Sequence, residues 1–248
     1  PPPLRSTPCE LTPSLPNAAG ARSELEGADE ETEAEFVRGV PPLVPLLAQG
    51  ATHVRLASPL GRTIYEAALP CSVAAAAEAL FSAGSSFIPT LCRRQGGAAG
   101  RDEVRVEAWR CDGGGLVRGV RWATDVRSKL SPVQRTRVVE EQSCATLEGG
   151  DVVLEARQAF PDLPKSLGPQ FLVRTQWRLS AADAASATGE ASRAGCGLAI
   201  TQELEWLSSS WLSKMVEKTT FEESTEAFGR LLPPLLQEIL GATQAPSR

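Results

Sequence analysis

Residues 197–240 read GLAITQELEWLSSSWLSKMVEKTTFEESTEAFGRLLPPLLQEIL, and this stretch decides the fold. Its first part, Leu198–Leu207, is strand-like, and the serines at 208–210 are natural N-caps for a helix. The sequence therefore predicts a last strand followed by a long amphipathic helix, which the Pro-Pro pair at 233–234 either kinks or ends. Apolar residues recur at helical spacing in three groups: Trp211, Leu212, Met215, Val216 and Thr219; Ala227, Phe228, Leu231 and Leu232; Leu235, Leu236 and Ile239.

The chain before this stretch is mostly strand-like. Arg62–Leu69 reads as a first strand, and Ser72 caps an alanine-rich helix directly after it. Five more strands are expected at 102–112, 115–126, 136–148, 151–160 and 171–180. The links between consecutive strands look like hairpins, so the strands should pair antiparallel. The order predicts an α+β domain in which a curved antiparallel sheet of about six to seven strands surrounds the C-terminal helix.

The 248 residues are expected to form one domain with flanking segments. Residues 1–35 are Pro-rich and then acidic, which is typical of a disordered tail. An extended lead-in, 36–59, should precede the domain at 60–241, and 242–248 should form a second tail. The net charge of −5 argues against a nucleic-acid partner.

Residues suited to catalysis or metal binding are scarce. His53 is the only histidine, and none of the six cysteines stands in a Cys-x-x-Cys pair, so neither a metal site nor a cofactor is expected. The thiols should be reduced in a cytoplasmic setting. An enzyme would need ionisable groups that converge in the interior, for which the candidates are Glu140, Glu155, Arg174 and Glu203. We expect no enzyme.

Three stretches carry a resemblance to a known family. The first is RGVRWATDV at 118–126, followed by Leu-Ser-Pro at 130–132; the second is FPDLP at 160–164, followed by Phe-Leu-Val at 171–173; the third is WLSSSWLSKMVE at 206–217. In this order they resemble the VASt family of StAR-related lipid-transfer (START-like) domains, over roughly residues 60–240. The chain departs from the family pattern in its loops: Asp125-Val126 replaces Pro-Leu, and Ser131-Pro132-Val133 replaces Gly-Pro-Lys.

The resemblance implies a helix-grip fold and a lipid-binding function. A sterol or similar apolar lipid would occupy a cavity between the sheet and the C-terminal helix and would be transferred between membranes. The protein would be a cytoplasmic monomer that touches anionic membranes, at endoplasmic reticulum contact sites if it carries an anchor.

Two groups of residues are expected to form the lipid site. The cavity wall should include large or apolar side chains on the strands and the last helix, although each tryptophan could equally be a filled core position: Trp122, Phe171, Trp177, Trp206, Trp211, Met215, Val216 and Thr219. A membrane-facing gate should combine an apolar tip with basic residues from two loops, unless the first loop packs inward: Phe87, Ile88, Leu91, Arg93 and Arg94, with Arg127, Lys129 and Arg135.

One alternative remains open. The same fold could sense or sequester a different apolar ligand, or dock a protein, without transferring lipid. A large cavity with a mobile lid favours transfer, whereas a cavity filled by its own tryptophans favours an interaction domain.

Overall fold

A computed structural model describes residues 59–96, 104–112, 115–128, 131–163, 170–181 and 195–243; for residues 112, 126–128, 131–134 and 242–243 only the backbone is described. All of them belong to the compact unit Gly39–Arg248. The expected tail at 1–35, the lead-in up to residue 58 and the last five residues lie outside the described part.

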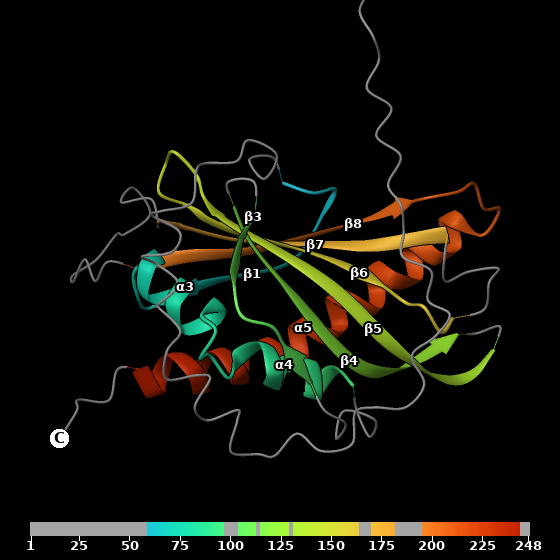
Figure 1. The fold of residues 1–248 in the computed structure, drawn as a ribbon, viewed down its shortest axis with the longest axis horizontal. Helices are drawn as coiled ribbons and strands as arrows, with labels where there is room; N and C mark the ends of the chain where they lie inside the picture. The colour runs from blue at the N-terminus through green and yellow to red at the C-terminus, as the bar shows by residue number, and fades with distance from the viewer. Residues whose placement is uncertain are drawn as a thin grey trace, which may run out of the picture. The chain divides into compact units, whose positions relative to one another are not determined.

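Eight strands form one curved antiparallel sheet that does not close, which confirms the expected α+β, START-like architecture (Figure 1). The strands pair in the order β1-β8-β7-β6-β5-β4-β2, and β3 also pairs with β4. The first and last long strands, β1 and β8, are therefore neighbours, and β1 is a sheet edge. The strands are β1 (Arg62–Leu69), β2 (Arg105–Val106), β3 (Arg110–Asp112), β4 (Gly115–Ser128), β5 (Ser131–Thr146), β6 (Val152–Ala159), β7 (Phe171–Ala181) and β8 (Cys196–Trp206).

The segment 102–112 was expected to be one strand, but it forms the two short strands β2 and β3. Between them, Trp109 turns into the core, where its indole nitrogen donates a hydrogen bond to the Phe81 carbonyl at 2.9 Å. Glu107 stays joined to β4: its backbone amide donates to the Gly119 carbonyl at 2.9 Å, and its carboxylate accepts a hydrogen bond from the Gly119 amide at 3.2 Å. A Cβ at position 119 would lie 2.8 Å from that carboxylate, so glycine permits this close approach.

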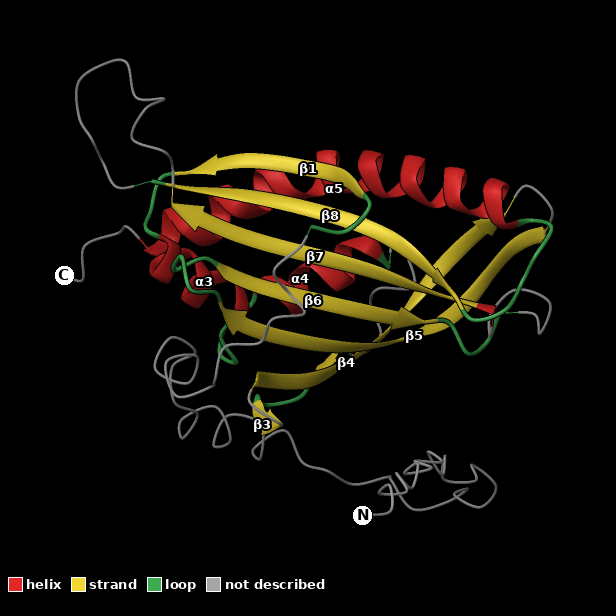
Figure 2. Cartoon of the chain, turned by 90° about the horizontal axis from the view of Figure 1, so that it is seen from above, coloured by secondary structure: helices red, strands yellow, loops and turns green. Residues whose placement is uncertain are grey.

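Three helices lie on the same side of the sheet (Figures 1 and 2). The helix α3 (Val73–Phe81) begins as expected at Ser72, whose hydroxyl accepts a hydrogen bond from the Ala75 amide at 3.3 Å. The segment expected to be a gate loop or helix end is a complete helix, α4 (Phe87–Gln95). The last helix, α5 (Ser213–Thr243), packs against α3, α4 and β1.

The proline pair does not end α5, which continues through Pro233 and Pro234 to Thr243. Both prolines are exposed, whereas Leu232 and Leu235 on either side of them are buried. Each proline lacks a backbone N–H and so removes one hydrogen-bond donor from the helix. Because the proline rings face solvent, the contact of α5 with the core is not disturbed.

Candidate functional site

Strand register determines which side chains share the inner, helix-covered face of the sheet. Leu154 of β6 lies opposite Trp177 of β7, which in turn lies opposite Ile200 of β8. The Trp177 ring meets Phe81 of α3 and Phe87 of α4 edge to face, with ring centroids 6.3 and 5.8 Å apart. Phe228 of α5 completes this cluster, at 5.6 Å from Trp177.

The two halves of α5 differ in how they meet the sheet. In the C-terminal half, Phe228 and several leucines are buried and close the core. In the N-terminal half, none of the residues from Ser213 to Ala227 is fully buried. Two open hollows of about 510 and 430 Å³ lie beside this half, and both are lined by Arg62 of β1 and by Phe221 and Glu222 of α5. They form a groove between the sheet edge and the helix, called here the β1–α5 groove.

Two contacts hold the N-terminal half of α5 near the sheet. The indole nitrogen of Trp206, the last residue of β8, donates a hydrogen bond to a Glu217 carboxylate oxygen at 2.8 Å. The guanidinium of Arg62 stacks over the Phe221 ring at 4.8 Å from its centroid. The helix is thus fastened beside the groove by side chains and not by a continuous apolar seam.

A buried polar group faces this region from β8. Gln202 is only 3% exposed and pairs across the ladder with Arg62 of the groove. Its amide nitrogen donates to the Thr175 hydroxyl at 3.3 Å, while its carbonyl oxygen has no hydrogen-bond partner. An unpaired buried acceptor is costly, so Gln202 is suited to receive a hydrogen bond from a ligand or a water.

A second buried polar network lies on β4 and β5. Arg118 is 1% exposed; its Nε donates to the Gln142 side chain at 2.7 Å, and its guanidinium carbon lies 4.1 Å from the centre of the Trp109 ring. Gln142 in turn donates to Glu140, which also accepts from Gln158 at 2.6 Å.

Burial sets the electrostatics of this network. Loss of solvation raises the pKa of the Glu140 carboxyl, which the hydrogen bonds from Gln158 and Gln142 and the charge of Arg118 oppose. Loss of solvation also lowers the pKa of Arg118 to about 10. One terminal nitrogen of Arg118, Nη2, has no hydrogen-bond partner.

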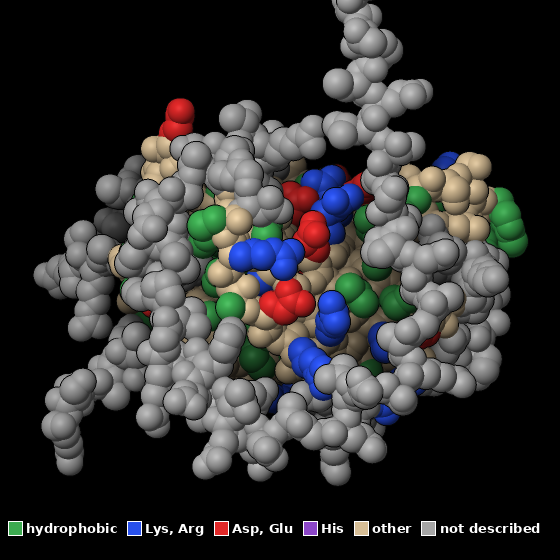
Figure 3. Space-filling model, viewed as in Figure 1, with side chains coloured by type: hydrophobic (Ala, Val, Ile, Leu, Met, Phe, Trp, Pro, Cys, Tyr) green, Lys and Arg blue, Asp and Glu red, His purple; other side chains and the backbone are tan. Residues whose placement is uncertain are grey.

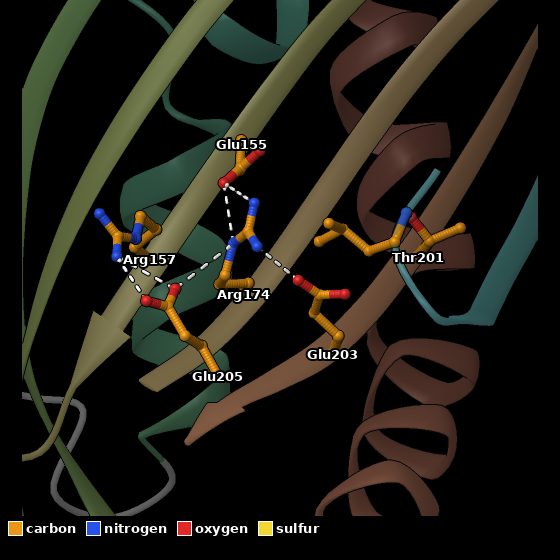
Figure 4. Close-up of polar contacts among 7 residues, drawn as sticks. Glu155, Arg157, Arg174, Thr201, Glu203 and Glu205 are labelled. Atoms are coloured by element: carbon orange, nitrogen blue, oxygen red, sulfur yellow. Dashed lines mark hydrogen bonds and ion pairs between the residues drawn. The ribbon is translucent and has the colours of Figure 1, made fainter. Parts of the chain in front are cut away.

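The other candidate ionisable residues lie on the outer face of the sheet. Arg174 of β7 is held between Glu155 of β6 and Glu203 of β8, and Glu205 pairs with Arg157 at 3.0 Å (Figure 4). Figure 3 shows basic and acidic side chains interspersed on one face of the molecule. Of the four candidates for interior chemistry, only Glu140 therefore lies on the helix-covered face.

The expected wall residues on the strands are brought together only in part. The rings of Phe171 and Trp206 meet at a tilt of 47° with centroids 5.3 Å apart, and the Phe160 ring lies 6.2 Å from that of Phe171. Trp122 is 6% exposed and lines a separate hollow of about 480 Å³ on β4 and β5. Trp177 is a filled core position.

The expected wall residues on the helix are divided. Val216 and Thr219 are half-buried. Trp211, however, is 90% exposed and Met215 is 44% exposed. Both side chains therefore point to solvent: Trp211 lies in the turn before the first helical residue, Ser213, and Met215 lies on α5 away from its buried stripe.

The apolar residues of the expected gate are not where the prediction placed them. Phe87, Ile88 and Leu91 are 0, 5 and 3% exposed and belong to the core, so they are not presented to a membrane. Of the basic residues beside them, Arg93 is exposed and Arg94 pairs with Glu238 of α5 at 2.6 Å. The second expected loop is instead the end of β4 and the start of β5, so Arg127 and Arg135 lie on strands. Arg135 is exposed, whereas the side chains of Arg127 and Lys129 lie outside the described residues.

Sequence reasoning missed the groove residues Arg62 and Phe221, and also Gln202. The signal for Phe221 was its spacing of seven residues from Phe228, two helical turns along the same stripe. Nothing in the sequence marks Gln202, because its importance comes from burial.

Within the described ranges, no three His, Cys, Asp or Glu side chains are arranged to hold a metal ion. None of the described helices has the length and hydropathy needed to span a membrane.

Comparison with known proteins agrees with this architecture. The model of the VASt family, described as the VAD1 Analog of StAR-related lipid transfer domain, matches residues 63–223. A search of curated proteins finds no match. The family match begins in β1, ends in α5 and includes most of the β1–α5 groove. The chain therefore belongs to the VASt family of StAR-related lipid-transfer domains.

Proposed function

We propose that this protein binds a sterol or a similar apolar lipid between the N-terminal half of α5 and the sheet, and transfers it between membranes. The observation that carries the proposal is the asymmetry of α5. Its C-terminal half seals the core, whereas its N-terminal half borders a groove with hollows of about 510 and 430 Å³. Ligand pockets commonly have volumes of roughly 300–1,000 Å³. Membership of a lipid-transfer family supports the same reading.

Helical geometry identifies the residues that would meet the lipid. Stepping back from the buried Phe228 by four and seven residues along the same stripe leads to Ser224 and Phe221. Both are half-buried, and so is Val216, five residues before Phe221. Ile64 of β1 lines the same hollow as Phe221. These side chains could enclose an apolar ligand once α5 moves by a small amount.

The energetics are those of exchange between two apolar environments. A lipid leaves the bilayer without a large penalty if the protein buries its surface equally well, at about 25 cal/mol per Å². A sterol hydroxyl must also keep a hydrogen bond when it leaves the membrane surface. The unpaired carbonyl oxygen of Gln202 would accept that hydrogen bond. Transfer needs no catalytic group, so this function uses none.

The test is transfer of a fluorescent sterol from donor to acceptor liposomes by the purified protein. Ser224→Trp should block the groove and abolish both binding and transfer. Glu223→Trp, at the neighbouring exposed position, is the matched control and should leave both unchanged. Wild-type protein that is folded but neither binds nor transfers the sterol would contradict the proposal.

A polar-head test refines the ligand class. Gln202→Leu should weaken binding of a free sterol, because the hydroxyl loses its acceptor, and should affect the corresponding sterol acetate much less. Equal loss for both ligands would mean that Gln202 contributes by packing and not by reading the hydroxyl.

The second candidate function is ligand sensing or protein docking without transfer. It is favoured by the packing of Trp177 among Phe81, Phe87 and Phe228, which fills the part of the inner face below α3 and α4. In that case the protein should bind the lipid in the groove with no acceleration of exchange between liposomes.

A further inference from the structure

Exposed apolar side chains are concentrated at one place. The described residues include four large apolar side chains that are exposed: Leu207, Trp211, Met215 and Val139. The first three lie within residues 207–215, where the chain passes from β8 into α5. Trp211 is 90% exposed, which leaves one of the largest apolar surfaces in the protein in water. We call Leu207, Trp211 and Met215 the apolar tip.

Hydrogen bonds give the apolar tip a defined shape. The Leu212 amide donates to the Ser210 hydroxyl at 3.3 Å, and the Ser213 amide donates to the Ser210 carbonyl at 3.2 Å. The first helical bond follows, from the Val216 amide to the Leu212 carbonyl at 2.9 Å. The turn is therefore anchored to α5, and the exposed side chains are held outward by an ordered backbone.

Two exposed lysines lie close in sequence to the apolar tip. Lys214 and Lys218 are exposed on the first turns of α5. Lys218 approaches Glu222 at 3.8 Å, an exposed contact that contributes little, and Glu217 accepts the Trp206 hydrogen bond. Lysines beside an exposed tryptophan are complementary to a bilayer surface, where anionic headgroups cover an apolar hydrocarbon layer. Tryptophan prefers the interface between the hydrocarbon and the headgroups of a bilayer.

The apolar tip also lies beside the groove. Lys214, Glu217 and Lys218 line the same hollow as Arg62 and Phe221. Figure 2 shows that the connection from β8 to α5 lies at the same end of the sheet as the hairpin between β4 and β5. The expected membrane-facing residues Phe87, Ile88 and Leu91, in contrast, are on α4, which is fastened to the opposite end of α5 through Arg94 and Glu238.

We propose that Leu207, Trp211 and Met215 form the surface by which this domain docks on an anionic lipid bilayer, with Lys214 and Lys218 contacting the headgroups. This inference rests on the proposed lipid-transfer function, since docking here would bring the β1–α5 groove against the membrane that supplies or receives the lipid. A bilayer fits better than a protein partner. Three protruding side chains offer far less than the roughly 800 Å² that each partner buries in a stable protein interface.

The experiment measures binding of the full chain to liposomes by co-sedimentation. Vesicles of phosphatidylcholine alone are compared with vesicles that also contain phosphatidylserine. Trp211→Gln should lower the affinity for the anionic vesicles about tenfold or more, because a large apolar side chain no longer inserts. Lys214→Gln combined with Lys218→Gln should remove most of the preference for phosphatidylserine. Val139→Gln alters the exposed apolar residue on the sheet and is the matched control, with no change expected.

A second readout separates this proposal from the proposed function. Sterol delivered from cyclodextrin, without a membrane, should bind Trp211→Gln as it binds the wild type, while transfer between anionic liposomes falls. Vesicle binding by Trp211→Gln at the wild-type level would overturn the docking proposal, and so would a wild type that binds no vesicles. Neither result would contradict lipid binding in the β1–α5 groove, provided that cyclodextrin-delivered sterol still binds. A wild-type dimer in analytical ultracentrifugation that Trp211→Gln converts to a monomer would also overturn it, in favour of a second copy of the chain.

Discussion

Replacing Arg118 with methionine tests how the buried network on β4 and β5 is balanced. The change removes a positive charge from a site that is 1% exposed and leaves Gln142 without its 2.7 Å donor. It also removes the guanidinium from the Trp109 ring. Methionine has a similar length and can occupy the space, so the expected loss reports on charge and hydrogen bonding more than on a cavity.

The cost follows from what is left behind. Arg118 and Glu140 meet through Gln142 and not in a direct ion pair, so removing Arg118 should cost about 3 kcal/mol, the lower end of the range for breaking a direct buried pair. The desolvated cation–π contact adds up to about 2 kcal/mol. The methionine side chain recovers roughly 1–2 kcal/mol through its own burial. We therefore expect Arg118→Met to lower the free energy of unfolding by about 3–4 kcal/mol at neutral pH.

The loss should depend on pH through Glu140. Burial raises the pKa of this carboxyl in the folded state, so its contribution to stability falls as pH rises from the ordinary glutamate pKa through the folded value. The charge of Arg118 holds that pKa down. Without it the pKa of Glu140 rises further, and the variant should lose more stability at pH 7.5 than at pH 5.

Urea unfolding of the wild type, Arg118→Met, Glu140→Gln and the double variant at these two pH values provides the assay. In the double variant the uncompensated charge is gone, so we expect it to recover at least 1 kcal/mol relative to Arg118→Met at pH 7.5. A cost below about 1 kcal/mol for Arg118→Met, equal at both pH values and unchanged by Glu140→Gln, would refute the reasoning.

Three further predictions concern other parts of the fold. Among the described cysteines, iodoacetamide should label exposed Cys111 first and leave Cys144 unlabelled in the native protein. The reason is that burial raises the pKa of the Cys144 thiol to about 12. Mass spectrometry of native and urea-treated samples measures which cysteines are labelled. Hydrogen bonds from Arg137 lower the pKa of Asp162 to about 2. This pair should therefore stabilise the fold above the ordinary aspartate pKa, and the stabilisation should be lost as pH falls through about 2. An NMR titration of Asp162 should give that midpoint, and an unchanged midpoint in Arg137→Ala would contradict the assignment. Trp206→Phe removes the donor that fastens β8 to α5, so amide exchange should accelerate in the first turns of α5 while the last turns keep their protection; uniform acceleration along the helix would argue against a local latch.

The order of elements was predictable because it rests on local signals. Ser72 and the alanines after it begin α3, and strand-like runs separated by turn residues form the antiparallel sheet. The strand before the last helix and the family motifs were also local features. The direction of each side chain is different, because both faces of this sheet carry charged residues. Arg118 points inward and Glu155 outward, although both alternate with apolar neighbours.

The gate prediction failed for a similar reason. A segment with Phe87, Ile88 and Leu91 followed by two arginines suits a membrane tip and an amphipathic helix equally well. What decides is the neighbour: Trp177 lies on β7, far away in sequence, and packs against Phe87. Single-sequence patterns do not contain this contact.

The assignment of Trp211 and Met215 to the cavity failed on helical phase. Counting back from Phe228 along the buried stripe reaches Phe221 and then Glu217, so Met215 lies off that stripe. Trp211 precedes Ser213, where α5 begins, and its direction is set by the turn at Ser210. When a helical pattern is extended to residues before the helix begins, it predicts a buried face for side chains that are not part of the helix.

Photo-crosslinking tests the central claim most directly. A sterol with a photoactivatable group would be bound to the purified protein, irradiated and located by peptide mass spectrometry. The account predicts labelling in the N-terminal half of α5, around Phe221 and Ser224, and in β1 near Ile64, with both signals lost in Ser224→Trp. Labelling confined to the hollow beside Trp122, or a labelling pattern that Ser224→Trp leaves unchanged, would contradict it.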